Sequence, residues 1–310
     1  MGHRRFKAPV PHKGGSVLKD KFDFRVFFFI GPAIIFLILI IIYPLFMVLP
    51  CSFQEYSAQS HSFFFVGLKQ YQRLFSDSLF WLSIKTTFIF TIITIILHLV
   101  VAWVIALLLN AEWPSVRARN FFRGALILPY IFSPPAAALL WGILYHPLGL
   151  LSYLSRQLLH TRIGFLSDPK VAMFSVLLVN AWNCYPLYMI LLLGGLQSIL
   201  KSMYDAAKVD GANRLQLFLH ITLPQMSSLI MTIVIIDFIT TFIHFDLVWI
   251  MTKGGPLRST YLISFFLYEK GLLPYKFGYA SALSVIIALF ISVFLFIYVV
   301  SYFKRWEIQP

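Results

Sequence analysis

The chain has 310 residues, of which 59% are hydrophobic and only 12% are charged, whereas an ordinary soluble domain carries about 25% charged residues. Several apolar runs exceed the roughly 20 residues that a helix needs to cross a bilayer, and they lack the short alternating segments of a β-barrel. The composition excludes a soluble domain and predicts an all-α fold, a polytopic membrane helical bundle.

The net charge of +13 does not indicate nucleic-acid binding, because the positive residues flank the apolar runs and form no stripe of their own. Two cysteines, Cys51 and Cys184, are too few for a disulfide framework or a metal site. No cleavable signal sequence is expected, since the first apolar run is longer than a signal-peptide core.

Three regions follow one another along the chain. Residues 1–24 form a basic N-terminal tail, residues 25–303 a membrane domain and residues 304–310 a C-terminal tail. Because Pro129 and the Pro134–Pro135 pair lie in the third apolar run, we expect a broken or kinked helix there. The domain is predicted to contain six transmembrane helices with these approximate limits: 25–50, 81–110, 121–146, 171–196, 227–251 and 279–303.

The distribution of Lys and Arg predicts the orientation of these spans. Seven lie in the first 25 residues, against two in the first loop, at Lys69 and Arg73. This bias places the N-terminus in the cytoplasm, and an even number of spans returns the C-terminus to the same side. The connection between the fourth and fifth spans, over residues 197–226, is therefore expected to be cytoplasmic.

This connection carries an unusual concentration of charge. Four charged residues fall within ten positions: Asp205, Lys208, Asp210 and Arg214. The pattern predicts two short helices broken at Gly211, the first covering residues 203–213 along the membrane surface with Asp205 in its first turn. A simple connection needs no such pattern, so we expect a soluble partner to dock here; a solvated amphipathic loop is the alternative.

Polar residues recur at helical spacing within two spans. They are Asp237, Thr240, Thr241 and His244 in the fifth span and Asn180, Asn183, Cys184 and Leu187 in the fourth. An ionisable group near the bilayer centre costs several kcal/mol unless it faces water or a partner. The two stripes therefore predict a hydrated path for a solute, although hydrogen bonds between helices would explain them as well.

Three other residues in the spans are given structural roles. Trp182 falls on the helix face opposite Asn180 and is expected to pack outward. His98 is alone in an apolar span and is expected only to be hydrogen-bonded, and Asp246 is expected to be a packing or interface acid.

No catalytic set is present. The sequence shows no Ser-His-Asp arrangement, no cluster of metal ligands and no phosphate-binding glycine loop. A proton-coupled secondary transporter that uses Asp237 and His244 is the alternative to a transport subunit. Six spans without an internal repeat, together with the docking element, argue against it.

The run Tyr204-Asp-Ala-Ala…Asp210-Gly-Ala…Ile221-Thr-Leu-Pro224 resembles the EAA–Gly loop of the permease subunits of binding-protein-dependent ATP-binding-cassette importers, with Asp205 in place of the usual Glu. Within that family the chain is similar to the sugar group, and most closely to the maltose F-type and glycerol-phosphate A-type permeases. Further similar segments are Phe65–Tyr71, Ala106–Asn110, Leu128–Tyr130, Gly194–Ser198, Thr252–Pro256 and Phe277–Ala282.

The resemblance implies a permease subunit of the inner membrane, with both termini cytoplasmic, that translocates a sugar or oligosaccharide. It implies no cofactor in this chain, since ATP and Mg would bind a separate ATPase. The implied partners are a second permease subunit in a heterodimer, two ATP-binding-cassette ATPase subunits, a solute-binding protein and membrane lipid.

The resemblance also assigns residues. The implied substrate-binding positions are Asn180, Trp182, Asn183, Cys184, Leu187, Asp237, Thr240, Thr241 and His244. The positions implied to couple the chain to the ATPase, in a cytoplasmic coupling helix, are Tyr204, Asp205, Ala206, Ala207, Asp210, Gly211 and Ala212.

Overall fold

The computed structural model describes residues 24–57, 62–111 and 113–306. Most of the predicted N-terminal tail and the last four residues of the C-terminal tail lie outside the described residues. The chain divides into two compact units, residues 1–50 and residues 51–310.

The first unit is a single apolar helix. It consists of α1 (Phe24–Leu37), a π-helical turn η1 (Ile38–Ile42) and α2 (Tyr43–Cys51). Large apolar side chains are exposed along it, as at Phe29, which is 81% exposed. A helix that is apolar on all sides is typical of a membrane span, and residues 29–51 are long enough to cross a bilayer.

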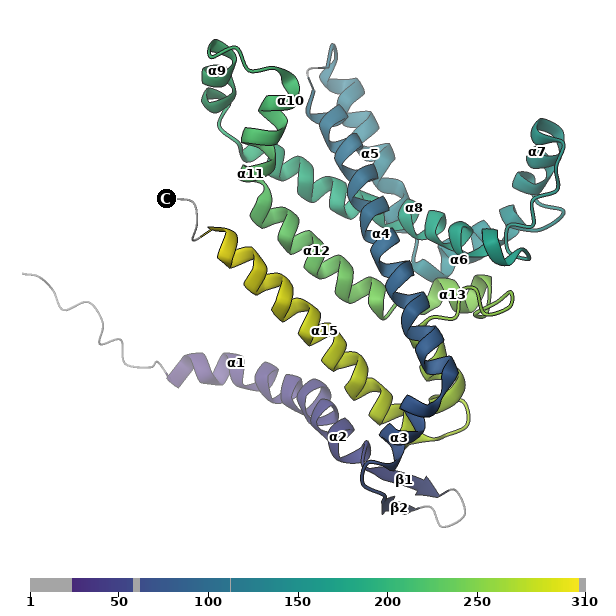
Figure 1. Cartoon of the computed structure of the whole chain (residues 1–310). Coiled ribbons are helices and arrows are strands. Elements are labelled where there is room, and N and C mark those ends of the chain that lie inside the picture. Colours follow the sequence, from purple (N-terminus) through teal and green to yellow (C-terminus); the bar gives the residue numbers. More distant parts are fainter. Residues whose placement is uncertain (1–23, 58–61, 112, 307–310) are drawn as a thin grey trace, which may run out of the picture. The chain divides into compact units, whose positions relative to one another are not determined.

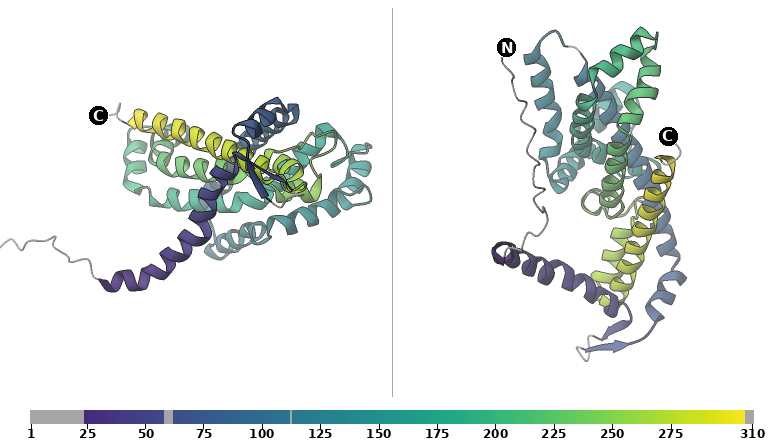
Figure 2. Two further views of the ribbon diagram at one scale, coloured as in Figure 1. Left: turned by 90° about the horizontal axis from the view of Figure 1, so that it is seen from below. Right: turned by 90° about the vertical axis from the view of Figure 1, so that its left-hand side faces the viewer.

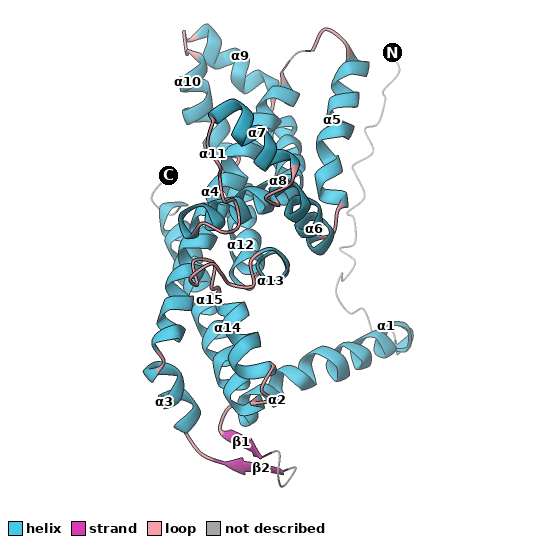
Figure 3. Ribbon diagram, turned by 90° about the vertical axis from the view of Figure 1, so that its right-hand side faces the viewer, coloured by secondary structure: helices cyan, strands magenta, loops and turns pink. Residues whose placement is uncertain are grey.

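The second unit begins with a small hairpin outside the long helices. Strand β1 (Gln54–Ser57) pairs antiparallel with β2 (Ser62–Phe65), and the short helix α3 (Lys69–Ser76) follows. The Arg73 guanidinium donates a hydrogen bond of 2.7 Å to Glu55. Figure 3 shows the hairpin beside α3.

Two long helices run through the bundle. Helix α4 (Ser78–Asn110) has 33 residues without Gly or Pro, and the Asp77 side chain accepts a hydrogen bond from the Leu79 amide at its start. Helix α8 (Pro169–Ser198) has 30 residues and begins with Pro169, which needs no amide partner there. At 1.5 Å per residue both exceed the thickness of the hydrocarbon core. They pack extensively against each other.

The third predicted span is broken, as the prolines indicated. Helix α5 (Val116–Ile131) ends before Ser133, whose hydroxyl accepts from the Ala136 amide and so begins α6 (Pro134–Tyr145). A separate helix, α7 (Leu150–Leu159), follows. The predicted limits of 121–146 match α5 and α6 to within a few residues, while the stretch of this region that is long and apolar enough to cross a membrane covers residues 134–159.

The fifth predicted span is also interrupted. Helix α12 (Ser227–Phe242) ends in a turn over residues 243–245, and α13 (Asp246–Met251) follows. His244 therefore does not continue the helical stripe of Asp237, and the prediction that the two residues share one helix face was wrong. Asp246, expected to be a packing or interface acid, is the exposed first residue of α13.

The chain closes with α14 (Ile263–Leu267), the π-helical turn η3 (Tyr268–Leu272) and α15 (Phe277–Trp306). Helix α12 contacts α4, α8 and α15. Six helical stretches among the described residues are long and apolar enough to cross a membrane, which agrees with the predicted number of spans.

The polar connection after α8 forms four short elements. These are α9 (Lys201–Val209), α10 (Arg214–Leu217), the π-helical turn η2 (Phe218–Thr222) and α11 (Leu223–Gln225). They lie at the end of the second unit opposite α3 and the hairpin (Figures 1 and 2). The second unit thus carries short elements beyond both ends of its long helices.

Candidate functional site

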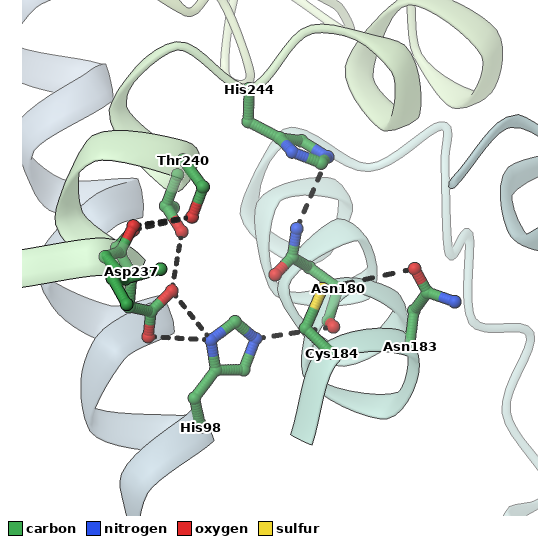
Figure 4. Close-up of polar contacts among 9 residues, drawn as sticks. His98, Asn180, Asn183, Cys184, Asp237, Thr240 and His244 are labelled. Carbon is green, nitrogen blue, oxygen red and sulfur yellow. Dashed lines mark hydrogen bonds and ion pairs between the residues drawn. The ribbon is translucent and has the colours of Figure 1, made fainter. Parts of the chain in front are cut away.

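Asp237 on α12 is the centre of a buried polar cluster (Figure 4). Its side chain is 0% exposed. Nδ1 of His98, on α4, lies 2.9 Å from Oδ2 and 3.1 Å from Oδ1 of this carboxylate. The Thr241 hydroxyl, one turn further along α12, donates to Oδ1 over 2.9 Å. The costly acid in the membrane is therefore paired within the chain.

His98 connects three helices. Its Nε2 lies 3.4 Å from the backbone oxygen of Asn180 on α8, while Nδ1 faces Asp237 on α12. A carbonyl and a carboxylate both accept hydrogen bonds, and an imidazole that carries both ring protons donates to both of them. This arrangement joins α4, α8 and α12 at one depth.

Asn180 and His244 form a second polar contact at the same place. The Asn180 amide Nδ2 lies 3.3 Å from His244 Nε2, and the His244 ring stacks on Phe90. The Asn180 side chain is buried, and its Oδ1 has no hydrogen-bond partner among the described residues. A buried acceptor without a donor is costly, so the Asn180 oxygen leaves an unmet demand for a hydrogen-bond donor within the cluster.

Asn183 stabilises the break between α5 and α6. Its amide donates to the backbone oxygens of Pro129, over 2.8 Å, and Phe132, over 3.0 Å. The Cys184 thiol lies at 4.0 Å from Asn183 Oδ1. Carbonyls freed by a helix break inside a membrane need a new donor, and Asn183 supplies one.

The remaining predicted residues lie at the edge of this cluster. Thr240 is exposed, and its hydroxyl donates to the backbone oxygens of Ile236 and Asp237. Leu187 is half-buried. Trp182 packs on the rings of Phe132 and Trp141 with centroids 5.8 and 5.5 Å away. The expectation that Trp182 packs outward was therefore wrong.

His98 is the residue whose role the sequence analysis missed. It was expected to be hydrogen-bonded, and it is, but its partner was not identified. A signal was present, because Thr87, Thr91, Thr94 and His98 recur at helical spacing in α4. All four side chains are buried. A third polar stripe, pointing into the bundle, would have indicated a partner for Asp237.

The connection between α9 and α10 has the predicted break. Gly211 has a φ of +83°, a conformation that favours glycine, and α10 begins with a capping box between Asn213 and Gln216. The helix covers Lys201–Val209 and not residues 203–213. Asp205 consequently lies in the second turn, 3.9 Å from Lys208, and not in the first turn as predicted.

A small cavity lies inside this connection. It has a volume of about 250 Å³ and is lined by residues of both short helices, among them Ala207, Asp210, Ala212 and Gln216. The Tyr204 hydroxyl reaches Thr222 over 2.9 Å and so ties α9 to η2. Ala206 is exposed. The element is a folded unit with small side chains on its surface, as a docking element requires.

Residues 111–306 match the family described as binding-protein-dependent transport system inner membrane component. This range is well over half of the chain. The chain belongs to this family. It is a permease subunit of a transporter and not an enzyme, and ATP hydrolysis takes place in a separate subunit. Among the described residues no group of His, Cys, Asp and Glu is arranged to hold a metal ion.

Individual relatives of this permease cover nearly its whole length. The probable ABC transporter permease protein YurN of Bacillus subtilis is 31% identical over 90% of this chain and 95% of its own. The lactose transport system permease protein LacF of Rhizobium radiobacter is 30% identical over 91% and 95%. The predicted class, an ABC importer permease, is confirmed.

Solved structures agree on the fold. A chain of a bacterial ABC transporter that imports the acidic polysaccharide alginate superposes with a TM-score of 0.80, at 22% identity, over 93% of this permease and 97% of that chain. The predicted all-helical membrane bundle is therefore confirmed.

Proposed function

We propose that this permease carries a sugar or oligosaccharide across the inner membrane after delivery by a solute-binding protein. Relatives named for lactose and for trehalose and maltose transport support a sugar as the solute. A structural neighbour was solved in complex with a periplasmic protein that holds an alginate pentasaccharide, which supports delivery by such a protein. A second permease subunit and two ATPase subunits complete the assembly.

The observation that carries this proposal is that the polar side chains of His244 and Thr240 keep accessible surface at the edge of the buried Asp237 cluster. They present an imidazole and a hydroxyl but no uncompensated charge. Groups of this kind exchange hydrogen bonds with hydroxyls without the desolvation cost of an isolated ion. A polyhydroxylated solute fits such a surface.

The predicted substrate positions divide into two groups by burial. Trp182, Cys184, Leu187, Thr240 and His244 keep accessible surface and form the proposed contact layer. The other four side chains are buried and hold this layer in place: Asn180, Asn183, Asp237 and Thr241. A solute would therefore contact Thr240 and His244, while Asp237 acts through its hydrogen bonds.

The α9–α10 connection is the proposed contact with the ATPase. It projects from the ends of the membrane helices, and its short first helix exposes Asp205 and Ala206. Its position beyond α8, together with the Lys and Arg bias of the first segment, supports a cytoplasmic location for it and for both termini.

The test is solute uptake by the full importer reconstituted in vesicles. Thr240→Val and His244→Phe are expected to reduce the uptake of the cognate sugar about ten-fold or more, since each removes a hydrogen-bonding group at the contact layer. Thr232→Val is the matched control, because Thr232 lies exposed on the same helix and donates only to the Ser228 carbonyl.

Two results would contradict the proposal. If both contact-layer variants take up sugar at the normal rate per inserted permease, the cluster only packs helices together. If no sugar is taken up by the complete unmodified importer with its binding protein, the solute class is wrong.

A further inference from the structure

A second polar cavity lies at the other end of α8 from the α9–α10 connection. It has a volume of about 710 Å³, within the range of small-molecule sites. The end of α6, helix α7 and the loop over residues 160–168 surround it. None of the residues assigned above to solute or ATPase contacts lines it.

Two arginines make this cavity positively charged. Arg156 on α7 and Arg162 in the following loop both line it, together with His146, Ser152 and Ser167, and no Asp or Glu does. Neither arginine forms an ion pair within the part of the chain that the structure describes. The cavity therefore presents uncompensated positive charge.

Arg156 is held in place by the protein itself. Its Nε donates to the Ser152 carbonyl over 3.2 Å, and its Nη2 donates to the Pro147 carbonyl over 3.4 Å. Since a guanidinium has five N–H donors, three remain for a ligand. The half-buried guanidinium is thus oriented before anything binds, which lowers the cost of binding.

The walls of the cavity are equally well defined. The rings of Tyr145 and Phe165 stack with centroids 4.8 Å apart, and both residues line it. Gly149 closes the turn between α6 and α7, where a Cβ would collide with the carbonyl oxygens of Ile143 and Leu144. An apolar and aromatic wall with a few fixed polar groups is the usual composition of a ligand site.

We propose that Arg156 and Arg162 form a binding site for an oxyanion. Guanidinium groups bind carboxylates and phosphates through paired, charge-assisted hydrogen bonds. The carboxylate of an acidic saccharide and the phosphate of a lipid headgroup share this chemistry. The site is separate from the Asp237 cluster and does not depend on which solute crosses the membrane there.

The test measures ligand binding to the full permease in nanodiscs of phosphatidylcholine. The probes are α-1,4-digalacturonate and α-1,4-galactobiose, which differ in carrying carboxylates or hydroxymethyl groups. Digalacturonate should bind, and galactobiose about ten-fold more weakly or worse. Arg162→Gln should lower digalacturonate affinity about ten-fold, because it removes one of the two guanidinium groups. No hydrogen bond within the described chain engages the Arg162 side chain, so folding should be unaffected.

A second arm distinguishes the two sources of the oxyanion. Native mass spectrometry in nanodiscs that contain phosphatidylglycerol reports whether this lipid is retained. Retention that disappears in Arg156→Gln and Arg162→Gln, without digalacturonate binding, assigns the site to a lipid headgroup. Arg156→Lys, which keeps the charge, guards against loss of folding, and Arg117→Gln at the exposed start of α5 is the control.

Equal affinity for the two sugars combined with arginine-independent lipid retention would overturn the proposal. So would anion binding that stays unchanged in both Arg156→Gln and Arg162→Gln. These results are independent of sugar uptake by the importer, so a failure here leaves the proposed function standing.

Discussion

The contact between His98 and Asp237 should contribute measurably to the stability of the bundle. The two side chains are 1% and 0% exposed, and Nδ1 of His98 lies within 3.1 Å of both carboxylate oxygens. In His98→Phe the carboxylate loses the imidazole and keeps hydroxyl donors such as Thr241 and Tyr188. Removing one partner of a buried ion pair costs about 3–5 kcal/mol.

A double-mutant cycle measures the coupling free energy between His98 and Asp237. His98→Phe and Asp237→Val should each lower the free energy of unfolding by about 3–5 kcal/mol, because each leaves the other group buried without its partner. The double replacement leaves neither group behind. It should therefore cost about 2 kcal/mol less than the sum of the single replacements.

The assay is equilibrium unfolding of the purified permease in mixed micelles with increasing SDS, followed by tryptophan fluorescence. Thr232→Val, an exposed substitution on α12, should stay within about 0.5 kcal/mol of the unmodified protein. Additive losses in the cycle, or single losses below about 1 kcal/mol, would refute the claim that these two residues join the helices as a pair.

Three further predictions concern the ends of the bundle. Gly211 has a φ of +83°, which a leucine rarely adopts, so Gly211→Leu should reduce co-purification of the ATPase several-fold. Gly124→Ala, where a Cβ meets open space, should leave co-purification unchanged. Equal recovery of the ATPase with both variants would contradict the docking role. The hydrogen bond from Arg73 holds the pKa of Glu55 below its ordinary value, so the stability it adds is present above the unfolded pKa and is lost as the pH falls through the lower folded pKa; protection of the hairpin amides from hydrogen exchange, corrected for the intrinsic rate, should fall as the pH is lowered from about 5 to about 3, and this dependence should be lost in Glu55→Gln. Reporter fusions after Gly67 and after Gly211 should report opposite sides of the membrane, and the same side for both would refute the orientation.

The number and character of the spans could be predicted because they depend on local composition. An apolar run of about 20 residues must be buried in lipid or protein wherever it occurs. The break at Ser133 was also predictable, since Pro134 and Pro135 cannot donate to preceding carbonyls. In α12 no proline marks the end at Phe242, and the interruption before Asp246 was missed.

The candidate site was only half predictable for a related reason. Helical spacing brought Asp237 and Thr241 together, because both lie on one helix. His98 precedes Asp237 by 139 residues, so their contact depends on how α4 packs against α12. Spacing along one helix contains no information on that packing, and a histidine without a visible partner was taken as isolated.

The hydrogen bonds from Asn183 to the end of α5 constrain how this permease can diversify. Any residue at position 183 must keep supplying a donor to the Pro129 and Phe132 carbonyls, since unpaired carbonyls are costly in hydrocarbon. The hydroxyl of Thr240 donates to the Ile236 and Asp237 carbonyls of its own helix, and no carbonyl at a helix break depends on it, so position 240 is less constrained. Changes of solute preference during evolution should therefore accumulate at 240 and its exposed neighbours while 183 stays polar. A saturation library at positions 183 and 240, selected for growth on different sugars, would show that position 240 tolerates more residue types than position 183.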